Sequence, residues 1–284
     1  MIGCEAVTDS GTDLDANTKN FFRRPVSLMR ELERDLTSDP PACTSAKRGC
    51  VAIVGAGRLG MALSRALRDA GYQLVGPLGR GPHAIEADAV LLCVPDKEIP
   101  AAAAGIAIGP IVGHCSGATG LDALAPHEAC SLHPLMTVTP AGAQFGGAGA
   151  AIAGSTPRAL ALAGQLAAAL GMRATEIAES DRPAYHAAAS IASNFLITLE
   201  AAAERVAASA GLERELLVPL VRATVENWAS FGSAAALTGP VARGDTETVS
   251  RQRAAVATRT PDLVALFDAL VSATEALAAR AAIG

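Results

Sequence analysis

The sequence predicts an α/β protein in which a doubly wound parallel sheet is followed by an all-helical C-terminal domain. Three observations support this prediction. Short apolar runs alternate with helical patterns between residues 49 and 180, as successive βαβ units require. Strand patterns stop after about residue 181. From there on the chain consists of long, Ala-rich helical patterns, the first of them PAYHAAASIASNFLITLEAAAERVAASAG.

The predicted strands are apolar segments bounded by turn residues. In chain order they are CVAIVGAG, YQLVG, AVLLCVP, IVGHCSG, ACSLHPL, GAAIAGS and RATEIA. Two predicted helices, RLGMALSRALRDAG and PRALALAGQLAAALG, lie among them. Residues 49–180 therefore form the predicted sheet domain.

The predicted helical domain spans residues 181–284. Its later helices are ELLVPLVRATVENWASF, TETVSRQRAAVAT and TPDLVALFDALVSATEALAAR. In the last of these, Thr260 is the expected N-cap and Pro261 occupies the first helical position, which together are a strong helix start signal.

The composition excludes several classes of function. The formal net charge is -5 and the basic residues are scattered, so nothing predicts binding to nucleic acid or to an anionic membrane. No apolar run reaches the roughly 20 residues of a membrane helix. The polar N-terminus lacks the pattern of a signal peptide. We therefore expect a cytoplasmic protein in which residues 1–48 are a polar, flexible tail, with a short helix predicted from the spacing of Leu28, Leu32 and Leu36.

The cysteine pattern predicts neither disulfides nor a metal site. The chain has 6 cysteines, and no two of them form a C-x-x-C pair. Dispersed cysteines in apolar runs are typical of reduced, buried thiols in a cytosolic protein. Ligand spacing for zinc is absent, so we expect no metal.

A glycine motif comes directly after the first predicted strand and directly before the first predicted helix. In this context Gly55 makes the tight turn, Gly57 lets the backbone approach a pyrophosphate, and Gly60 lets the helix pack on the strand. The helix N-terminus then presents free N–H groups to the phosphates. The expected cofactor contacts are the residues of the motif: Gly55, Ala56, Gly57, Arg58, Leu59 and Gly60.

The residues that follow the second strand bear on the choice of dinucleotide. NAD-binding proteins usually place an Asp or Glu about 20 residues after the glycines, for the ribose hydroxyls. This sequence has VGPLGRGPH there, with Arg80 and no acid. A guanidinium suits a 2′-phosphate, so the sequence favours NADP, although a solvated loop arginine is the alternative. Because ligands bind beyond the carboxyl ends of strands, we also expect Val94, Pro95, Ser116 and Gly117 at the cofactor.

Polar residues mark one face of the first helix of the helical domain. His186, Ser190 and Asn194, which we call the polar stripe, recur at every fourth position in an otherwise apolar helix. We expect His186 to be the first candidate for a proton donor and His133, from the fifth strand, the second. Ser190 and Asn194 are then expected to bond a substrate oxygen or a water. Hydrogen bonding between helices is the alternative role for the stripe.

Other candidate substrate contacts come from the sheet and from a late loop. The chain has no lysine beyond Lys97, which excludes a lysine proton donor or Schiff base in the helical domain. We expect His114 and Ser116 to approach the substrate from the sheet side. In the stiff loop ALTGPVARGD, Arg243 and Asp245 are candidate substrate contacts, and Arg243 could hold a substrate carboxylate by a bidentate contact. An ion pair between Arg243 and Asp245 that closes the loop is an equal alternative.

Several motifs together resemble a known family. GAGRLG, AVLLCVPD, HCSGA, SLHPL, YHAAASIASN and ALTGPVARGD occur in an order similar to that of Rossmann-like oxidoreductases carrying the C-terminal domain of unknown function twenty-five-twenty. The resemblance covers about residues 50–280. It implies an NADP-binding domain, a helical domain that forms a homodimer, and a site in the crevice between the two.

This group is more distantly similar to ketopantoate reductases, pyrroline-5-carboxylate reductases and β-hydroxyacid dehydrogenases. Several of those place Lys-x-x-x-Asn on the first helix of the second domain. Here Ser190 and Asn194 keep the spacing, but serine replaces lysine. The resemblance therefore carries over to Asn194 only, and His186, one turn earlier, is the candidate substitute for the lysine.

The residues and the resemblance together predict an NADP-dependent oxidoreductase. The expected substrate is a small carbonyl or imine compound with a carboxylate, and the resemblance makes ketopantoate the first to test. The alternative is an NADP-binding sensor or partner-binding protein without turnover, which the missing lysine favours. A substrate-sized pocket beside the nicotinamide would distinguish the two. In a third interpretation, the polar stripe lies in a subunit interface.

Overall fold

A seven-stranded sheet with the order β2-β1-β3-β4-β5-β6-β7 organises the first part of the chain. This computed structural model describes residues 48–79, 85–140 and 142–281. The strands β1, β3, β4 and β5 run parallel, as the sequence predicts. Their bounds and those of the other strands are β1 Arg48–Val54, β2 Tyr72–Leu78, β3 Ala89–Leu92, β4 Ile111–His114, β5 Ala129–Leu135, β6 Gly149–Gly154 and β7 Arg173–Glu176.

The last two strands depart from the predicted all-parallel sheet. β6 is antiparallel to β5, and β7 is parallel to β6. The reason lies in the connection between Leu135 and Gly149, whose described residues contain no helix. Parallel neighbours need a long crossover, usually helical, that carries the chain back across the sheet, whereas a direct loop returns the chain antiparallel. The sheet is therefore mostly parallel.

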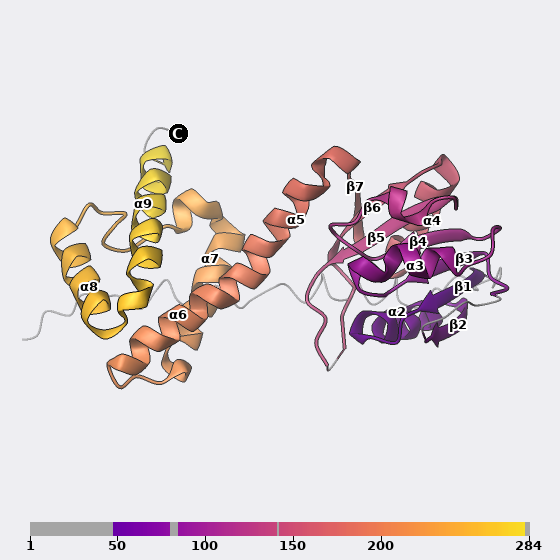
Figure 1. The fold of residues 1–284 in the computed structure, drawn as a ribbon. Coiled ribbons are helices and arrows are strands. Elements are labelled where there is room, and N and C mark those ends of the chain that lie inside the picture. The colour runs from indigo at the N-terminus through magenta and orange to yellow at the C-terminus, as the bar shows by residue number, and fades with distance from the viewer. Residues whose placement is uncertain (1–47, 80–84, 141, 282–284) are drawn as a thin grey trace, which may run out of the picture. The chain divides into compact units, whose positions relative to one another are not determined.

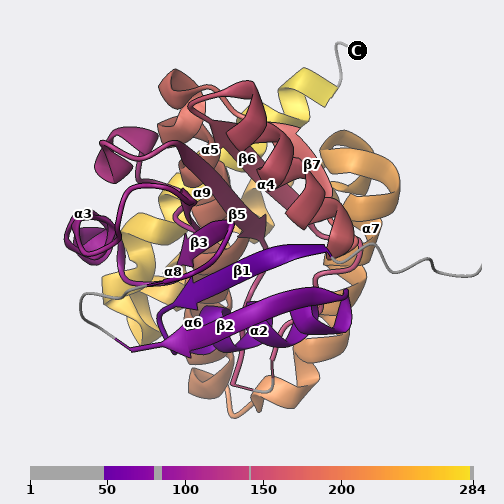
Figure 2. The same ribbon diagram turned by 90° about the vertical axis from the view of Figure 1, so that its right-hand side faces the viewer.

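Helices cover both faces of the sheet, which confirms the doubly wound architecture (Figures 1 and 2). Side chains alternate along a strand, so Ile53 packs with Leu63 of one helix layer while Ala52 packs with Ile99 of the other. The central strands β3 and β4 are buried at every residue, as expected for a parallel sheet, whereas the edge strand β7 is exposed. The helices of this part are α2 Arg58–Asp69 and α4 Pro157–Ala169 on one face and α3 Ile99–Ala104 on the other.

No strand follows β7 in the described residues, which confirms the all-helical C-terminal region (Figure 1). Its helices are α5 Arg182–Ser190, α6 Leu196–Ser209, α7 Val218–Ala236, α8 Thr246–Arg259 and α9 Val264–Ala281. A π-helical turn, η5 (Ile191–Phe195), joins α5 directly to α6. Such turns are rare and are frequently found at functional sites, and this one contains Asn194 of the predicted polar stripe.

The start of the last helix differs from the prediction. Thr260 occupies the N-cap position and Pro261 follows it, as expected, but the Thr260 side chain makes no capping bond. Its hydroxyl instead donates to the carbonyl of Val256, 3.3 Å away. The chain then makes a 3-10 turn, η7 (Pro261–Leu263), before α9 begins. The threonine thus links α8 to the turn that follows.

The predicted division of the chain into a tail, a sheet domain and a helical domain stays a prediction. Gly49–Gly284 is one compact unit. The division of this unit at residue 180 stays a prediction. The predicted tail helix with Leu28, Leu32 and Leu36, and the predicted cofactor residue Arg80, lie outside the described residues.

The described cysteines are free thiols. Burial raises the pKa of Cys130 to about 12, and a hydrogen bond with Cys93 raises the pKa of Cys115. Buried, protonated thiols of this kind are poor nucleophiles. In the ranges that the structure describes, no cluster of His, Cys, Asp and Glu side chains could hold a metal ion. None of the described helices is long and apolar enough to span a membrane.

Candidate functional site

The glycine motif forms the turn between β1 and α2, and each glycine has its own steric reason. Gly55 has a φ of 109°, and a Cβ there would lie 2.3 Å from the carbonyl oxygen of Cys93. A Cβ on Gly60 would lie 1.9 Å from the carbonyl oxygen of Gly55. Gly57 instead faces open space, since a Cβ placed there would have no neighbouring atom within 4 Å. The first and third glycines are therefore needed by the fold, and the second keeps a surface clear.

The open surface at Gly57 suits a dinucleotide pyrophosphate. Gly57 is the N-cap residue of α2, and no side chain caps the helix there. The first turn of α2 also carries no acidic residue. Free N–H groups and the positive end of the helix dipole therefore face the place where the backbone is bare. Val94, which follows β3, borders the same turn, since its Cγ1 lies 3.3 Å from a Cβ placed on Gly55.

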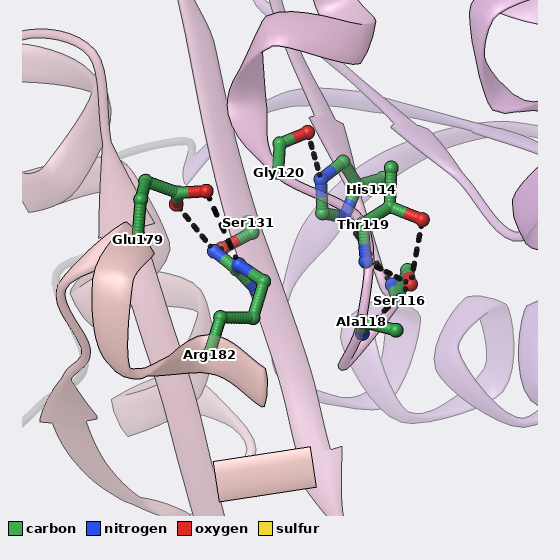
Figure 3. A network of polar contacts seen from close by, with 8 residues as sticks. All are labelled: His114, Ser116, Ala118, Thr119, Gly120, Ser131, Glu179 and Arg182. Carbon is green, nitrogen blue, oxygen red and sulfur yellow. Dashed lines mark hydrogen bonds and ion pairs between the residues drawn. The ribbon is translucent and has the colours of Figure 1, made fainter. Parts of the chain in front are cut away.

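His114 and Ser116 shape the loop after β4 (Figure 3). The ring of His114 is fully buried, with Nδ1 accepting from the Ser116 N–H at 3.2 Å and Nε2 lying 3.3 Å from the Gly120 carbonyl oxygen. Burial lowers the pKa of His114, so the ring is neutral. The Ser116 hydroxyl accepts from the N–H groups of Ala118 and Thr119. The loop therefore uses both side chains internally, which favours a positioning role over substrate contact.

Arg182, at the start of α5, ties that helix to β5 (Figure 3). Its side chain is only 3% exposed. Nη2 donates to the Ser131 hydroxyl at 3.1 Å and to a Glu179 carboxylate oxygen at 2.7 Å, and Nε donates to the other oxygen at 3.3 Å. A buried guanidinium with a carboxylate partner places a fixed positive charge beside the histidines of the site.

Gly117 brings two histidines together. A Cβ on Gly117 would lie 2.8 Å from Cε1 and 3.0 Å from Nε2 of His133, and 2.9 Å from Cδ2 of His186. The two imidazole centroids are 6.4 Å apart. Gly117 follows β4, His133 belongs to β5 and His186 to α5. Three segments that are far apart in sequence thus meet here. Gly117 is a predicted cofactor contact and His186 belongs to the polar stripe, so the predicted cofactor and substrate residues lie side by side at this point.

Tyr185 completes this group of side chains. Its hydroxyl oxygen lies 2.7 Å from Nδ1 of His133, and the two rings meet edge to face. Burial lowers the pKa of His133 to about 4, and the charges of His186 and Arg182 act in the same direction. Burial also raises the pKa of Tyr185. Both groups are therefore neutral at pH 7, and the hydrogen bond between them joins an uncharged phenol to an uncharged imidazole.

A cavity of about 450 Å³ lies against this group. Its lining includes His133 and the residues that follow it on one side, and the polar stripe on the other. The full lining is His133, Leu135, Met136, Thr137, Tyr185, His186, Ala188, Ala189, Ser190, Ala192, Ser193 and Asn194. None of these side chains carries a permanent charge. The volume suits a small organic molecule, and the polar groups are hydroxyls, an amide and two imidazoles.

Arg243 and Asp245 lie elsewhere in the described chain. Gly239 and Gly244 have φ angles of 99° and 69°, so the loop has the unusual path that its glycines predict. The Asp245 carboxylate caps α8 by accepting from the Thr248 N–H at 3.0 Å. Neither Arg243 nor Asp245 lines the cavity beside His133. Within one chain, Asp245 therefore caps α8 and does not contact this cavity.

Sequence reasoning missed two residues of the site, Arg182 and Tyr185. Arg182 directly precedes the proline at which the apolar helix pattern begins, so it resembled a solvated helix end. Tyr185 is one of only 2 tyrosines in the chain and adjoins His186, which is the one signal that could have identified it. Its partner His133 is 52 positions away in the sequence, and no local pattern links them.

The comparisons agree with this architecture. Residues 149–274 match the family described as Domain of unknown function (DUF2520), which confirms the resemblance for that part of the chain. No curated protein matches the chain by sequence.

Solved structures are similar to this chain over a longer stretch than the family match, which includes the strands of the sheet. The protein TM1727 from Thermotoga maritima is 25% identical, with a TM-score of 0.67 over 81% of this chain and 98% of its own. BF3122 from Bacteroides fragilis, described as a candidate NADP oxidoreductase, is 18% identical, with a TM-score of 0.69 over 81% and 98%. The 1-pyrroline-5-carboxylate reductase of Streptococcus pyogenes is 13% identical, with a TM-score of 0.55 over 80% and 98%. The latter two likenesses show a common fold.

Proposed function

We propose that the chain is an NADP-dependent oxidoreductase that transfers a hydride between NADPH and a small carbonyl or imine compound. The observation that carries the proposal is the meeting of Gly117, His133 and His186 beside a cavity of about 450 Å³. In open α/β sheets ligands bind beyond the carboxyl ends of the strands, where Gly117 lies. A reductase needs a substrate-sized pocket at that edge, and a sensor does not.

The cofactor part of the proposal is supported by the turn at Gly57 and by the fold. The uncapped α2 N-terminus and the clear surface at Gly57 fit a pyrophosphate. The similar fold of BF3122, a candidate NADP oxidoreductase, supports the choice of cofactor. When bound, NADPH supplies the hydride, and the chain supplies the orientation and the proton. We assign residues 49–180 to cofactor binding and residues 181–284 to substrate binding and dimerisation.

The proposed substrate is a small compound with a carboxylate, and ketopantoate is the first to test. The cavity lining contains no arginine or lysine. A substrate carboxylate bound within one chain would therefore be held by hydroxyl and amide groups, for which Ser190, Ser193 and Asn194 are placed. A cytoplasmic location fits the free thiols, since a reducing compartment keeps thiols unpaired.

Replacing Gly57 with alanine tests the cofactor site. The added methyl group meets open space, so the melting temperature should stay unchanged, while the affinity for NADPH should fall by about tenfold or more. Affinity is measured by the fluorescence of bound NADPH. Gly146→Ala, which also meets open space but lies away from the turn, serves as the control and should bind NADPH like the wild type. Equal affinity in both variants would contradict the proposed site.

The reaction itself is tested by NADPH oxidation with a panel of 2-oxo acids and cyclic imines, with ketopantoate first and NADH as the comparison cofactor. Turnover with one compound identifies the substrate class. Tight NADPH binding without turnover across the panel would favour the alternative, an NADP-binding sensor or partner-binding protein.

We further propose that the helical region pairs with a second copy of the chain. In the described residues 183–281, only Ala207, Val256 and Thr260 are buried. A groove of about 570 Å³ between α6, α8 and α9 is lined almost wholly by apolar side chains. A region of this length needs a larger core than one chain provides. The apolar side chains exposed in this region are Ile191, Phe195, Ile197, Leu199, Leu212, Leu216, Leu220, Val225, Trp228, Phe231 and Leu270.

Phe231→Glu is expected to convert the dimer to a monomer, because this ring is 67% exposed in the single chain and a buried carboxylate would oppose pairing. Light scattering after gel filtration measures the mass. Trp228, the only tryptophan, gives a second signal, since its emission should be blue-shifted in the dimer and red-shifted in the variant. Ile108→Glu places the same change on an exposed residue of the sheet region and should leave the mass unchanged. A wild-type monomer would contradict the pairing.

A further inference from the structure

Tyr185 and His133 share a hydrogen bond whose direction determines where the His133 ring carries its hydrogen. The Tyr185 hydroxyl oxygen and His133 Nδ1 are 2.7 Å apart. A neutral imidazole has a single N–H, on either Nδ1 or Nε2, and the other nitrogen accepts. The partner of one nitrogen therefore sets the chemistry of the other.

Tyr185 is the donor in this bond. In the part of the chain that the structure describes, His133 Nδ1 is the one atom hydrogen-bonded to the Tyr185 hydroxyl. Burial raises the pKa of Tyr185, so the phenol keeps its hydrogen at neutral pH and needs an acceptor for it. An unprotonated imidazole nitrogen is a good acceptor. The hydrogen of His133 therefore lies on Nε2.

Nε2 of His133 faces the proposed site of reaction. It lies 3.0 Å from a Cβ placed on Gly117, beside the loop that follows β4. No hydrogen bond within residues 48–79, 85–140 and 142–281 engages this nitrogen. His133 and Tyr185 both line the cavity, whose other groups lack a permanent charge. The N–H group at His133 Nε2 is therefore free to donate a proton to a molecule bound in the cavity.

We propose that Tyr185 is a positioning residue that holds His133 in the Nε2-protonated tautomer, so that His133 Nε2 gives the proton to the reduced substrate. The inference rests on the proposed function for its substrate. In the step, the Nε2–H bond breaks and an O–H or N–H bond forms on the substrate. The O–H bond of Tyr185 breaks and an N–H bond forms at Nδ1. The proton on Nδ1 then returns to the tyrosine oxygen, and water protonates Nε2, which restores the starting tautomer.

Arg182 favours this relay. Its charge acts on Tyr185 in the direction that lowers the tyrosine pKa, opposing the larger effect of burial. A transient negative charge on the phenol oxygen is therefore partly compensated. The same charge opposes a positive charge on His133, which keeps the ring neutral between turnovers.

The first test measures the tautomer of His133 without cofactor or substrate. Protein with ¹³C- and ¹⁵N-labelled histidine is studied by NMR, and the His133 signals are assigned by their loss in His133→Gln. We expect the Nε2–H tautomer in the wild type and a mixture of tautomers in Tyr185→Phe. Tyr72→Phe, which removes the other tyrosine hydroxyl from β2, is the matched control and should resemble the wild type. An Nδ1–H tautomer in the wild type, or no change in Tyr185→Phe, would overturn the proposal.

A pH titration of the same samples adds a second readout. The His133 pKa should rise in Tyr185→Phe, because the lost bond stabilises the neutral ring. The charges that act on the His133 pKa come from His186 and Arg182 of α5, His114 of β4 and Asp96 of η2 (Asp96–Glu98). All of them remain in both tyrosine variants. A His133 pKa that is equal in both variants would count against the proposed direction of the bond.

The kinetic test separates this inference from the proposed function. With an active substrate, Tyr185→Phe should lower kcat by roughly 10- to 100-fold while KM and NADPH affinity stay near the wild-type values. An unchanged kcat would overturn the relay. If the wild type turns over no compound, the proposed reductase function fails, and the tautomer measurement still decides the role of Tyr185.

Discussion

Replacing Gly117 with alanine is expected to lower turnover by roughly 100-fold, because a displacement of about 1 Å at a reacting group has effects of that order. The added methyl group would lie 2.8 Å from the His133 ring and 2.9 Å from the His186 ring. Both rings must then move away from the loop that follows β4. Gly117 has no positive φ, so the backbone itself tolerates alanine, and the melting temperature should change little. Steady-state NADPH oxidation and a thermal melt measure the two quantities.

Ala118→Ser is the control for this variant, because Ala118 is the next residue and is exposed. It adds one atom toward solvent and should retain wild-type turnover. Wild-type turnover in Gly117→Ala would mean that neither histidine needs its observed position, and the proposed site would be wrong.

Replacing Arg182 with methionine is expected to lower the free energy of unfolding by about 3 kcal/mol, at the lower end of the values for a broken buried ion pair. The lower end applies because Glu179 is 47% exposed and can turn to water. The Ser131 hydroxyl, which is fully buried, loses its guanidinium partner. Urea unfolding at pH 7 measures the change. Arg205→Met removes a guanidinium from an exposed pair with Asp262 and should unfold like the wild type.

The difference between Arg182→Met and the wild type should narrow in acid. The His133 pKa is about 4 in the folded chain, below its usual value of 6.5. Between these values the unfolded chain binds a proton that the folded chain does not, so stability falls as the pH drops from about 6.5 to 4. Arg182 is one cause of the lowered pKa, so the variant should lose less stability over this range. A difference that is constant from pH 7 to pH 4 would show that Arg182 does not act on His133.

The sequence by itself determined the features that depend on neighbouring residues. The glycine motif could be assigned residue by residue, because the needs of Gly55, Gly57 and Gly60 arise within one strand–turn–helix unit. The strands and the longer helices followed from local periodicity, as did the change to an all-helical region after β7, whereas the short helix α3 was not predicted. The polar stripe also followed from spacing, and its residues line one cavity.

Only the tertiary structure decided the direction of β6 and the roles of the histidines. His114 and His133 look alike in sequence, each near the end of an apolar strand. The register pairs His114 with Ser131, so His133 lies two residues further along β5 and reaches past the end of β4. His114 is consequently enclosed by its own loop, while His133 meets Gly117, Tyr185 and the cavity. Such pairings join residues from different elements, and their energies depend on distances that no local pattern encodes.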